Sequence, residues 1–319
     1  MNAIDLTGLP TRHPAACLAT YGMSSVLECG FSFTGPDGHA VLHTPMSLGE
    51  VAAALANPAT WRAALPHEVT RLLYAKKKKG SGDDPEKDAP GITVETFQVA
   101  AAADPWWAFG IGTDHVRKLN KDKVMAPDTT SFQPAMRNDT LSGAMNVWVE
   151  AVLRVTPPPK VVKPKRGQPA PPPLPLPPTP AERVAKILTC PRWDYAEEGK
   201  NFMIFPELPS QVQFRGSVKM RNVPILNLLA FCHWKNCQTY RLGEGVGTPG
   251  WFDDDVGSCL VCPIPEVPTS RRTLMSWLLN AHLMKGGTQH GRGCPRTLRF
   301  RQVVVTKYDR SLSWADPTA

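Results

Sequence analysis

The sequence predicts an α+β protein with mixed helices and short antiparallel sheets, in two parts that a proline-rich linker joins. Three patterns predict this class: a stripe of small and apolar residues near the N-terminus, a run of prolines in the middle, and a strand-like alternation near the C-terminus. The chain has 319 residues, of which 42% are hydrophobic, so it is long enough for two domains. We expect an N-terminal α+β domain at residues 1–155, a proline-rich basic linker at 156–180 and a C-terminal α+β domain at 181–319.

The first predicted helix begins near Pro14, because proline is well tolerated in the first helical turn. Small and apolar residues then recur at helical spacing and form one stripe: Ala15, Leu18, Ala19, Gly22, Met23, Val26 and Leu27. The first half of this stripe has small side chains, so another backbone can approach it closely. We therefore expect a buried packing helix.

Ser47 and Glu50 have the spacing of a capping box and predict a second helix to about Ala54. A third helix is predicted from Pro66 to Tyr74. It runs into four lysines: Lys76, Lys77, Lys78 and Lys79. Cations are favourable at the C-terminal end of a helix, so this run is either a solvated helix end or a loop that contacts phosphates.

Aromatic and basic residues lie together in an irregular segment at 104–138, between a predicted strand at 92–99 and a predicted helix at 140–155. Trp106 and Trp107 suit stacking on bases. Four basic residues that suit phosphate contacts follow them: Arg117, Lys118, Lys121 and Lys123. A core anchor beside a solvated surface is the alternative interpretation.

Proline dominates the segment from Thr156 to Pro180. Proline fixes φ and lacks a backbone donor, so this segment cannot form a core helix or a central strand. We expect an extended, polyproline-like spacer. It is either a passive linker or, through its four basic residues, a strap along an anionic partner: Lys160, Lys163, Lys165 and Arg166.

Beyond the linker, the sequence predicts helices at 181–189, from Pro224 and from Ser270 to Lys285, with a strand at 256–264. The segment at 296–308 alternates as a strand does. Its apolar face carries Leu298 and Phe300, and its basic face carries Arg299 and Arg301. Together with Arg292 and Arg296, these arginines suit phosphate neutralisation. The alternative is an edge strand whose charges prevent aggregation.

Two cysteine pairs could together bind zinc: Cys232 with Cys237, and Cys259 with Cys262. Residues three apart in a strand point to opposite faces, however, and free cysteines are common in cores. Zinc binding and packing in the hydrophobic core therefore both remain possible roles for these cysteines.

The formal net charge of +8 favours an anionic partner such as a nucleic acid. The sequence shows no signal peptide and no membrane-spanning stretch, and its cysteines are scattered, so we expect a cytoplasmic protein that does not bind membranes. We find no nucleophile elbow, phosphate-binding loop or zinc-protease motif, and expect no catalytic residues. For an unfamiliar Cys/His enzyme, the candidates are His282, His290 and Cys294.

Two sets of segments resemble the large subunits of compact type I CRISPR surveillance complexes (Cascade) of the I-U or I-G group. Near the N-terminus they are Leu6–Pro10 and Ala16–Gly22, which resemble the opening of those proteins. In the second half they are Pro224–Phe231, Gly250–Trp251 and Cys262–Pro265, which resemble a late helix and strand. The resemblance covers about a third of the chain.

The resemblance implies a non-catalytic, DNA-binding subunit of an antiviral ribonucleoprotein that contains guide RNA and other Cascade subunits. Such a subunit reads the motif adjacent to the target (the PAM), stabilises the opened target DNA and recruits a separate helicase-nuclease. Three alternatives remain. They are a zinc-stabilised nucleic-acid-binding protein of another kind, a Cys/His enzyme, and an adaptor whose proline linker binds an aromatic groove.

Overall fold

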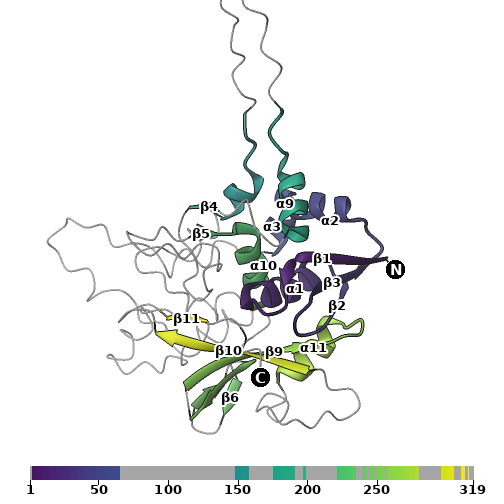
Figure 1. Ribbon diagram of the computed structural model, residues 1–319. Coiled ribbons are helices and arrows are strands. Elements are labelled where there is room, and N and C mark those ends of the chain that lie inside the picture. The colour runs from purple at the N-terminus through teal and green to yellow at the C-terminus, as the bar shows by residue number, and fades with distance from the viewer. Residues whose placement is uncertain are drawn as a thin grey trace, which may run out of the picture.

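The computed structural model contains helices and small antiparallel sheets, which confirms the α+β prediction (Figure 1). The predicted third helix at 66–74 and the strand at 92–99 lie outside the described residues. The structure describes residues 2–64, 148–157, 175–190, 197–198, 221–234, 240–242, 245–247, 249–255, 257–279, 296–304, 310–312 and 315.

The N-terminal part is a three-stranded antiparallel sheet with a helix packed on one face. Its elements are β1 (Asn2–Pro10), α1 (Pro14–Val26), β2 (Gly30–Phe33) and β3 (His39–Thr44), and the strand order is β1-β3-β2. The aromatic ring of Tyr21 on α1 lies 5.3 Å from that of Phe31 and 6.2 Å from that of Phe33. These three aromatic side chains therefore join the helix to the sheet.

Helix α1 begins where the sequence predicts, with Pro14 in its first turn. The side chain of His13 caps it by accepting a hydrogen bond from the backbone N–H of Ala15 at 3.2 Å. The small stripe packs against α10 (Pro224–Trp234), a helix that the sequence also predicts. A Cβ atom on Gly22 would lie 1.6 Å from the carbonyl oxygen of Leu229, so this contact requires glycine.

The capping box predicted at Ser47 and Glu50 is confirmed at the start of α2 (Leu48–Leu55). A short helix that the sequence analysis did not predict follows, α3 (Pro58–Ala64), and its Trp61 is buried. The helix predicted after the linker is α9 (Pro180–Thr189), which a second capping box opens. It packs against α2 and β1.

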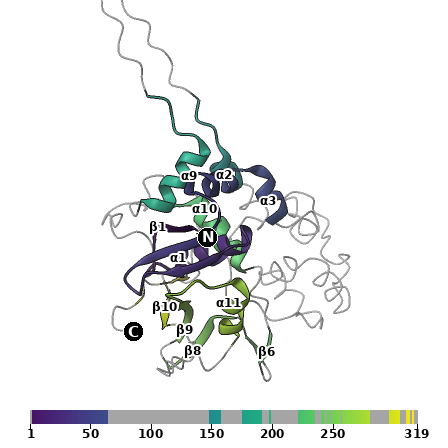
Figure 2. The same cartoon turned by 90° about the vertical axis from the view of Figure 1, so that its right-hand side faces the viewer.

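The C-terminal part contains a four-stranded antiparallel sheet in the order β11-β10-β9-β8, of which Figure 2 labels β10, β9 and β8. Its strands are β8 (Trp251–Asp254), β9 (Gly257–Ile264), β10 (Arg296–Val304) and β11 (Arg310–Leu312). Two-stranded pairs join β4 (Glu197–Glu198) to β5 (Arg221–Asn222), and β6 (Tyr240–Leu242) to β7 (Gly245–Gly247).

Helix α11 (Arg271–Leu278) begins after the predicted cap, Ser270, but it ends at Leu278 and is shorter than the predicted helix; residues 280–285 lie outside the described residues. The helix ends with Leu279 as its C-terminal cap. Leu274 and Leu278, four residues apart, are buried and anchor the helix, whereas the capping residue Leu279 is 52% exposed.

The two sides of the linker share one hydrophobic core. A single cluster of buried residues contains side chains from α1, the N-terminal sheet, α9, α10 and the C-terminal sheet. Phe31 in β2 exchanges two backbone hydrogen bonds with Thr269, and the hydroxyl of Tyr21 donates to the carbonyl of Pro263 at 2.6 Å. The domain boundaries at 155 and 181 stay a prediction, but the described residues on their two sides are packed together.

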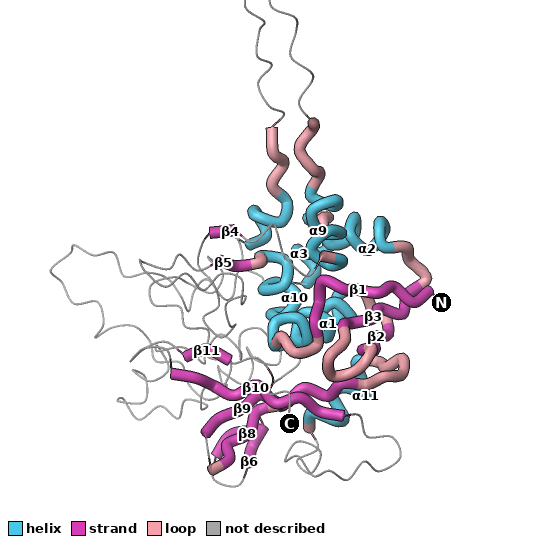
Figure 3. Tube along the Cα trace, in the orientation of Figure 1, coloured by secondary structure: helices cyan, strands magenta, loops and turns pink. Residues whose placement is uncertain are grey.

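The two ends of the proline-rich segment meet at the same place (Figure 3). Residues 148–153 are helical, so the helix predicted at 140–155 ends two residues early, and its residues 140–147 lie outside the described part. Residues 154–157 leave this helix beside residues 175–179, which lead into α9. The guanidinium of Arg183 on α9 donates hydrogen bonds to the carbonyl oxygens of Val152 and Arg154 and to the hydroxyl of Thr156. Arg183 therefore ties the departing chain to the returning chain.

Candidate nucleic-acid interface

Strand β10 places two of the predicted arginines side by side. Leu298 and Phe300 are buried, so the alternating residues Arg299 and Arg301 lie on the opposite face. Register pairs Arg299 with Val261 and Arg301 with Cys259 of β9. Both arginines are half-buried. Two guanidinium groups two residues apart on one face suit contacts with successive phosphates.

Arg296 does not belong to this pair. Alternation places it on the other face at the start of β10, where its side chain is 63% exposed and lies 3.9 Å from the carboxylate of Glu266. An ion pair this long and this exposed contributes little to stability.

Most of the other candidates lie outside the described residues. These are the stacking candidates Trp106 and Trp107, the lysine run, the basic residues after the tryptophans, and one arginine: Lys76, Lys77, Lys78, Lys79, Arg117, Lys118, Lys121, Lys123 and Arg292. The enzyme candidates His282, His290 and Cys294 also lie outside this part of the chain.

The described cysteines do not converge as the zinc hypothesis requires. Cys259 and Cys262 both lie within β9, which pairs with β10 without a break, so they point to opposite faces. Cys232 is buried in α10, and Cys237 lies outside the described residues. Among the residues that the structure describes, no group of three or more His, Cys, Asp or Glu side chains could hold a metal ion. Zinc stays an untested prediction for the full set.

Cys262 has a different neighbour, Cys17 of α1. The thiol of Cys17 donates to the carbonyl oxygen of Thr11 at 3.0 Å. Burial raises the pKa of Cys17, and its neighbour Cys262 raises that pKa further. The Cys17 thiol is therefore held in its neutral form and packs between helix and sheet, because nucleophiles and metal ligands act as thiolates.

His233 in α10 is buried, and its ring lies 5.0 Å from the ring of Tyr21. Burial lowers the pKa of His233 to about 3, with a smaller contribution from the positive charge of Arg271. The imidazole is thus neutral in the folded protein at neutral pH. Its position between α1 and α10 makes it a part of the core.

We expect His233 to make the protein sensitive to acid. Its pKa in the unfolded chain is near 6.5, so below that pH the unfolded state binds a proton that the folded state rejects. Stability is then full above pH 6.5 and falls as the pH drops toward 3, by up to about 1.4 kcal/mol per pH unit.

Urea unfolding at pH 6.5 and pH 5 measures this effect in the wild type and in His233→Phe, which keeps an aromatic ring against Tyr21. The wild type should lose about 2 kcal/mol more than the variant between these pH values. Equal losses in the two proteins would show that His233 does not titrate in this way. Because each protein is compared with itself at the two pH values, any difference in stability between wild type and variant at neutral pH cancels.

The N-terminal sheet carries polar pairs that the sequence analysis missed. Nε2 of His43 lies 2.8 Å from Oγ of Ser32, and Nε2 of His39 lies 3.1 Å from a carboxylate oxygen of Asp5. Strand register places all four on the face opposite α1. The sequence pattern that could have revealed them is the two-residue spacing of His39, Val41 and His43, which puts both histidines on one face of a strand. Because the histidines are four residues apart in one strand, about 13 Å, they cannot act on the same atom of a substrate.

Within the described part of the chain, no helix combines the length and the apolar character needed to cross a lipid bilayer. Comparison with protein-family models, with curated proteins and with solved structures gives no match to this chain.

Proposed function

We propose that the chain is a non-catalytic, nucleic-acid-binding subunit of an RNA-guided CRISPR surveillance complex. In this role it contacts guide RNA and target DNA, reads the target-adjacent motif, stabilises the opened duplex and recruits a separate helicase-nuclease. Its other partners are the remaining Cascade subunits, and it needs neither a metal nor a membrane.

The observation that carries the proposal is the packing of the segments that resemble the family. Leu6–Pro10 lies in β1, Ala16–Gly22 in α1 and Pro224–Phe231 in α10, and both of the earlier segments contact later parts of the chain. Gly22 from one segment meets Leu229 from another backbone to backbone. Motifs near the N-terminus and a motif about two hundred residues later thus meet in one packed core, which is what a single folded module requires.

Binding of nucleic acid is further supported by charge. The net charge is +8, and β10 presents Arg299 and Arg301 on one face. Each phosphate that such a residue neutralises releases a counterion, so affinity falls as salt rises. Half-buried arginines on a strand keep a fixed spacing, which favours a regular phosphate backbone.

The first experiment is gentle purification of the tagged protein from its native host, followed by identification of the proteins and nucleic acid that co-purify. Short repeat-derived RNA with several stoichiometric partner proteins supports the proposal. A monomer without nucleic acid, even at low salt, refutes it.

The arginine pair has its own test with the purified protein and a single-stranded oligonucleotide. Affinity falls with salt, so the slope of log affinity against log salt is negative. We expect the double variant Arg299→Gln, Arg301→Gln to make this slope less steep by about 1.4, which corresponds to two lost phosphate contacts. The matched control is Arg272→Gln, an exposed arginine on α11. An unchanged slope in the double variant would remove β10 from the interface.

A further inference from the structure

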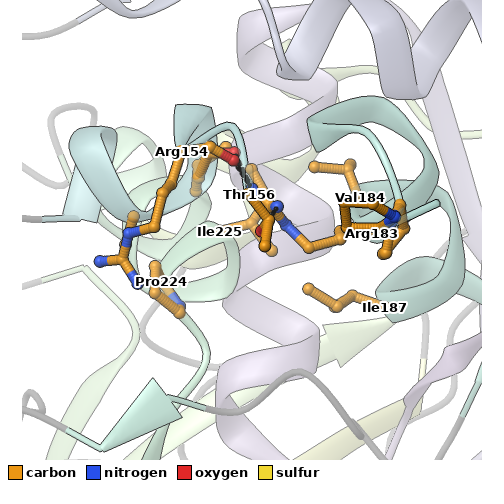
Figure 4. A pocket seen from close by; sticks show the side chains of 11 residues that line it. Arg154, Thr156, Arg183, Val184, Ile187, Pro224 and Ile225 are labelled. Atoms are coloured by element: carbon orange, nitrogen blue, oxygen red, sulfur yellow. Dashed lines mark hydrogen bonds between the residues drawn. The ribbon is translucent and has the colours of Figure 1, made fainter. Parts of the chain in front are cut away.

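A cavity of about 300 Å³ lies at the base of the proline-rich segment (Figure 4). Three parts of the chain line it: the end of the 148–153 helix with the residues that follow it, the extended segment before α9 with α9 itself, and the first residues of α10. Its walls are mostly aliphatic side chains and proline rings, including Val152, Pro177, Val184, Ile187 and Ile225. This volume is at the small end of the range for ligand sites, about 300–1,000 Å³, and suits a single large apolar side chain.

The cavity also carries positive charge. Arg154 and Arg183 line it, and none of its described lining residues is an acid. The acceptors that orient the guanidinium of Arg183 are neutral carbonyl and hydroxyl oxygens, so they fix its position without cancelling its charge. Figure 4 shows Arg183 reaching from α9 toward Thr156, while Arg154 extends past Pro224.

Large apolar side chains are exposed beside the cavity. Val155, next to the lining residue Arg154, is 75% exposed, and Leu176, next to Pro177, is 81% exposed. Exposed apolar groups that adjoin an apolar hollow are typical of protein interaction sites. The lining contains no aromatic ring among its described residues, whereas sites for unstacked bases usually offer one.

We propose that this cavity, which we call the linker-base cavity, is a docking site for a partner protein. The partner inserts one large apolar side chain, and an acidic residue adjacent to it binds the arginines. Charge complementarity selects the acid, and the aliphatic walls select the apolar side chain. The inference goes beyond the nucleic-acid role, because none of the residues proposed for that role lines the cavity.

The test uses the full chain with ¹³C-labelled isoleucine δ1 methyl groups and two short peptide probes. Ile187 and Ile225 report on the cavity, while Ile4 in β1 and Ile264 in β9 are internal references. We expect the blocked tripeptide Asp-Leu-Asp to shift the Ile187 and Ile225 methyl signals and to leave the references in place. The peptide Lys-Leu-Lys should shift none of them.

Two variants and one control sharpen this test. Arg154 is exposed, so Arg154→Gln should keep the fold and weaken binding of the acidic peptide about tenfold, the effect of losing a charge-assisted hydrogen bond. Ala151→Leu fills the cavity from a buried wall position and should abolish the shifts. Lys186→Gln, on the same helix as Ile187 but outside the lining, should bind as the wild type does.

The proposal is overturned if the acidic peptide shifts neither cavity methyl at concentrations up to about 10 mM, where even millimolar affinity is visible. Equal shifts with Lys-Leu-Lys would also overturn it, because the arginines would not be selecting the partner. A response to the dinucleotide pTpT instead of either peptide would reassign the cavity to nucleic acid. Oligonucleotide binding through Arg299 and Arg301 is measured separately, so failure here leaves the proposed function standing.

Discussion

Gly22→Val is expected to prevent the protein from folding. A Cβ atom at this position would lie 1.6 Å from the carbonyl oxygen and 2.5 Å from the carbonyl carbon of Leu229. Both are backbone atoms of α10, which is buried along its described length and therefore has little freedom to move away. Overpacking in a core typically costs 1–3 kcal/mol when only side chains must move, whereas this contact requires two helices to separate. The free energy of unfolding of a whole domain is only about 5–15 kcal/mol.

The measurement is the yield of soluble protein, followed by a thermal melt monitored by circular dichroism. We expect Gly22→Val to give no cooperative transition. Gly49→Ala is the matched control, because Gly49 lies in α2 and a Cβ there would have no atom within 4 Å. Alanine is the better helix former, so this control should be more stable than the wild type by about 0.5–1 kcal/mol. A wild-type melt for Gly22→Val would mean that α1 and α10 are not packed in this way.

The sequence predicts the small stripe of α1, but not the element that packs against it. Small residues at helical spacing indicate that some backbone comes close, and periodicity carries no information about which one. α10 is apolar around its whole circumference, so its sequence indicates a buried helix without indicating a face. Pairing between segments this far apart along the chain depends on tertiary packing, which a single sequence does not display.

In the candidate interface, too, the local features could be predicted from the sequence and the contacts between distant segments could not. The alternation in β10 predicts correctly that Leu298 and Phe300 lie opposite Arg299 and Arg301, because strand geometry is local. The same alternation separates Cys259 from Cys262. The linker-base cavity could not be predicted, since three separate segments of the chain must meet to form it. The end of α11 was missed because Leu279 has the composition of a buried helical residue but lies exposed.

Cutting the chain within the proline-rich segment is expected to leave one particle, and neither piece should fold alone. A specific protease site inserted after Arg166 gives an N-terminal piece with α1 and the first sheet, and a C-terminal piece with α9, α10 and the second sheet. After cleavage, both pieces should elute together in size-exclusion chromatography under native conditions and separate in 6 M guanidinium. The shared core holds them, since α10 covers α1 and Thr269 extends the hydrogen bonding of β2.

Each piece expressed alone exposes the surface that the other piece covers. The N-terminal piece loses every contact of α1 with α10, and the C-terminal piece loses the contact of Tyr21 with Pro263. A cooperative melt for either isolated piece would establish two independent domains at the predicted boundaries and would contradict the shared core. Failure of both pieces alone, with recovery when they are refolded together, would show that the proline-rich segment is an excursion from a single folded unit. The resemblance would then be carried by one module, because its early segments on β1 and α1 and its later segment on α10 can exist only together.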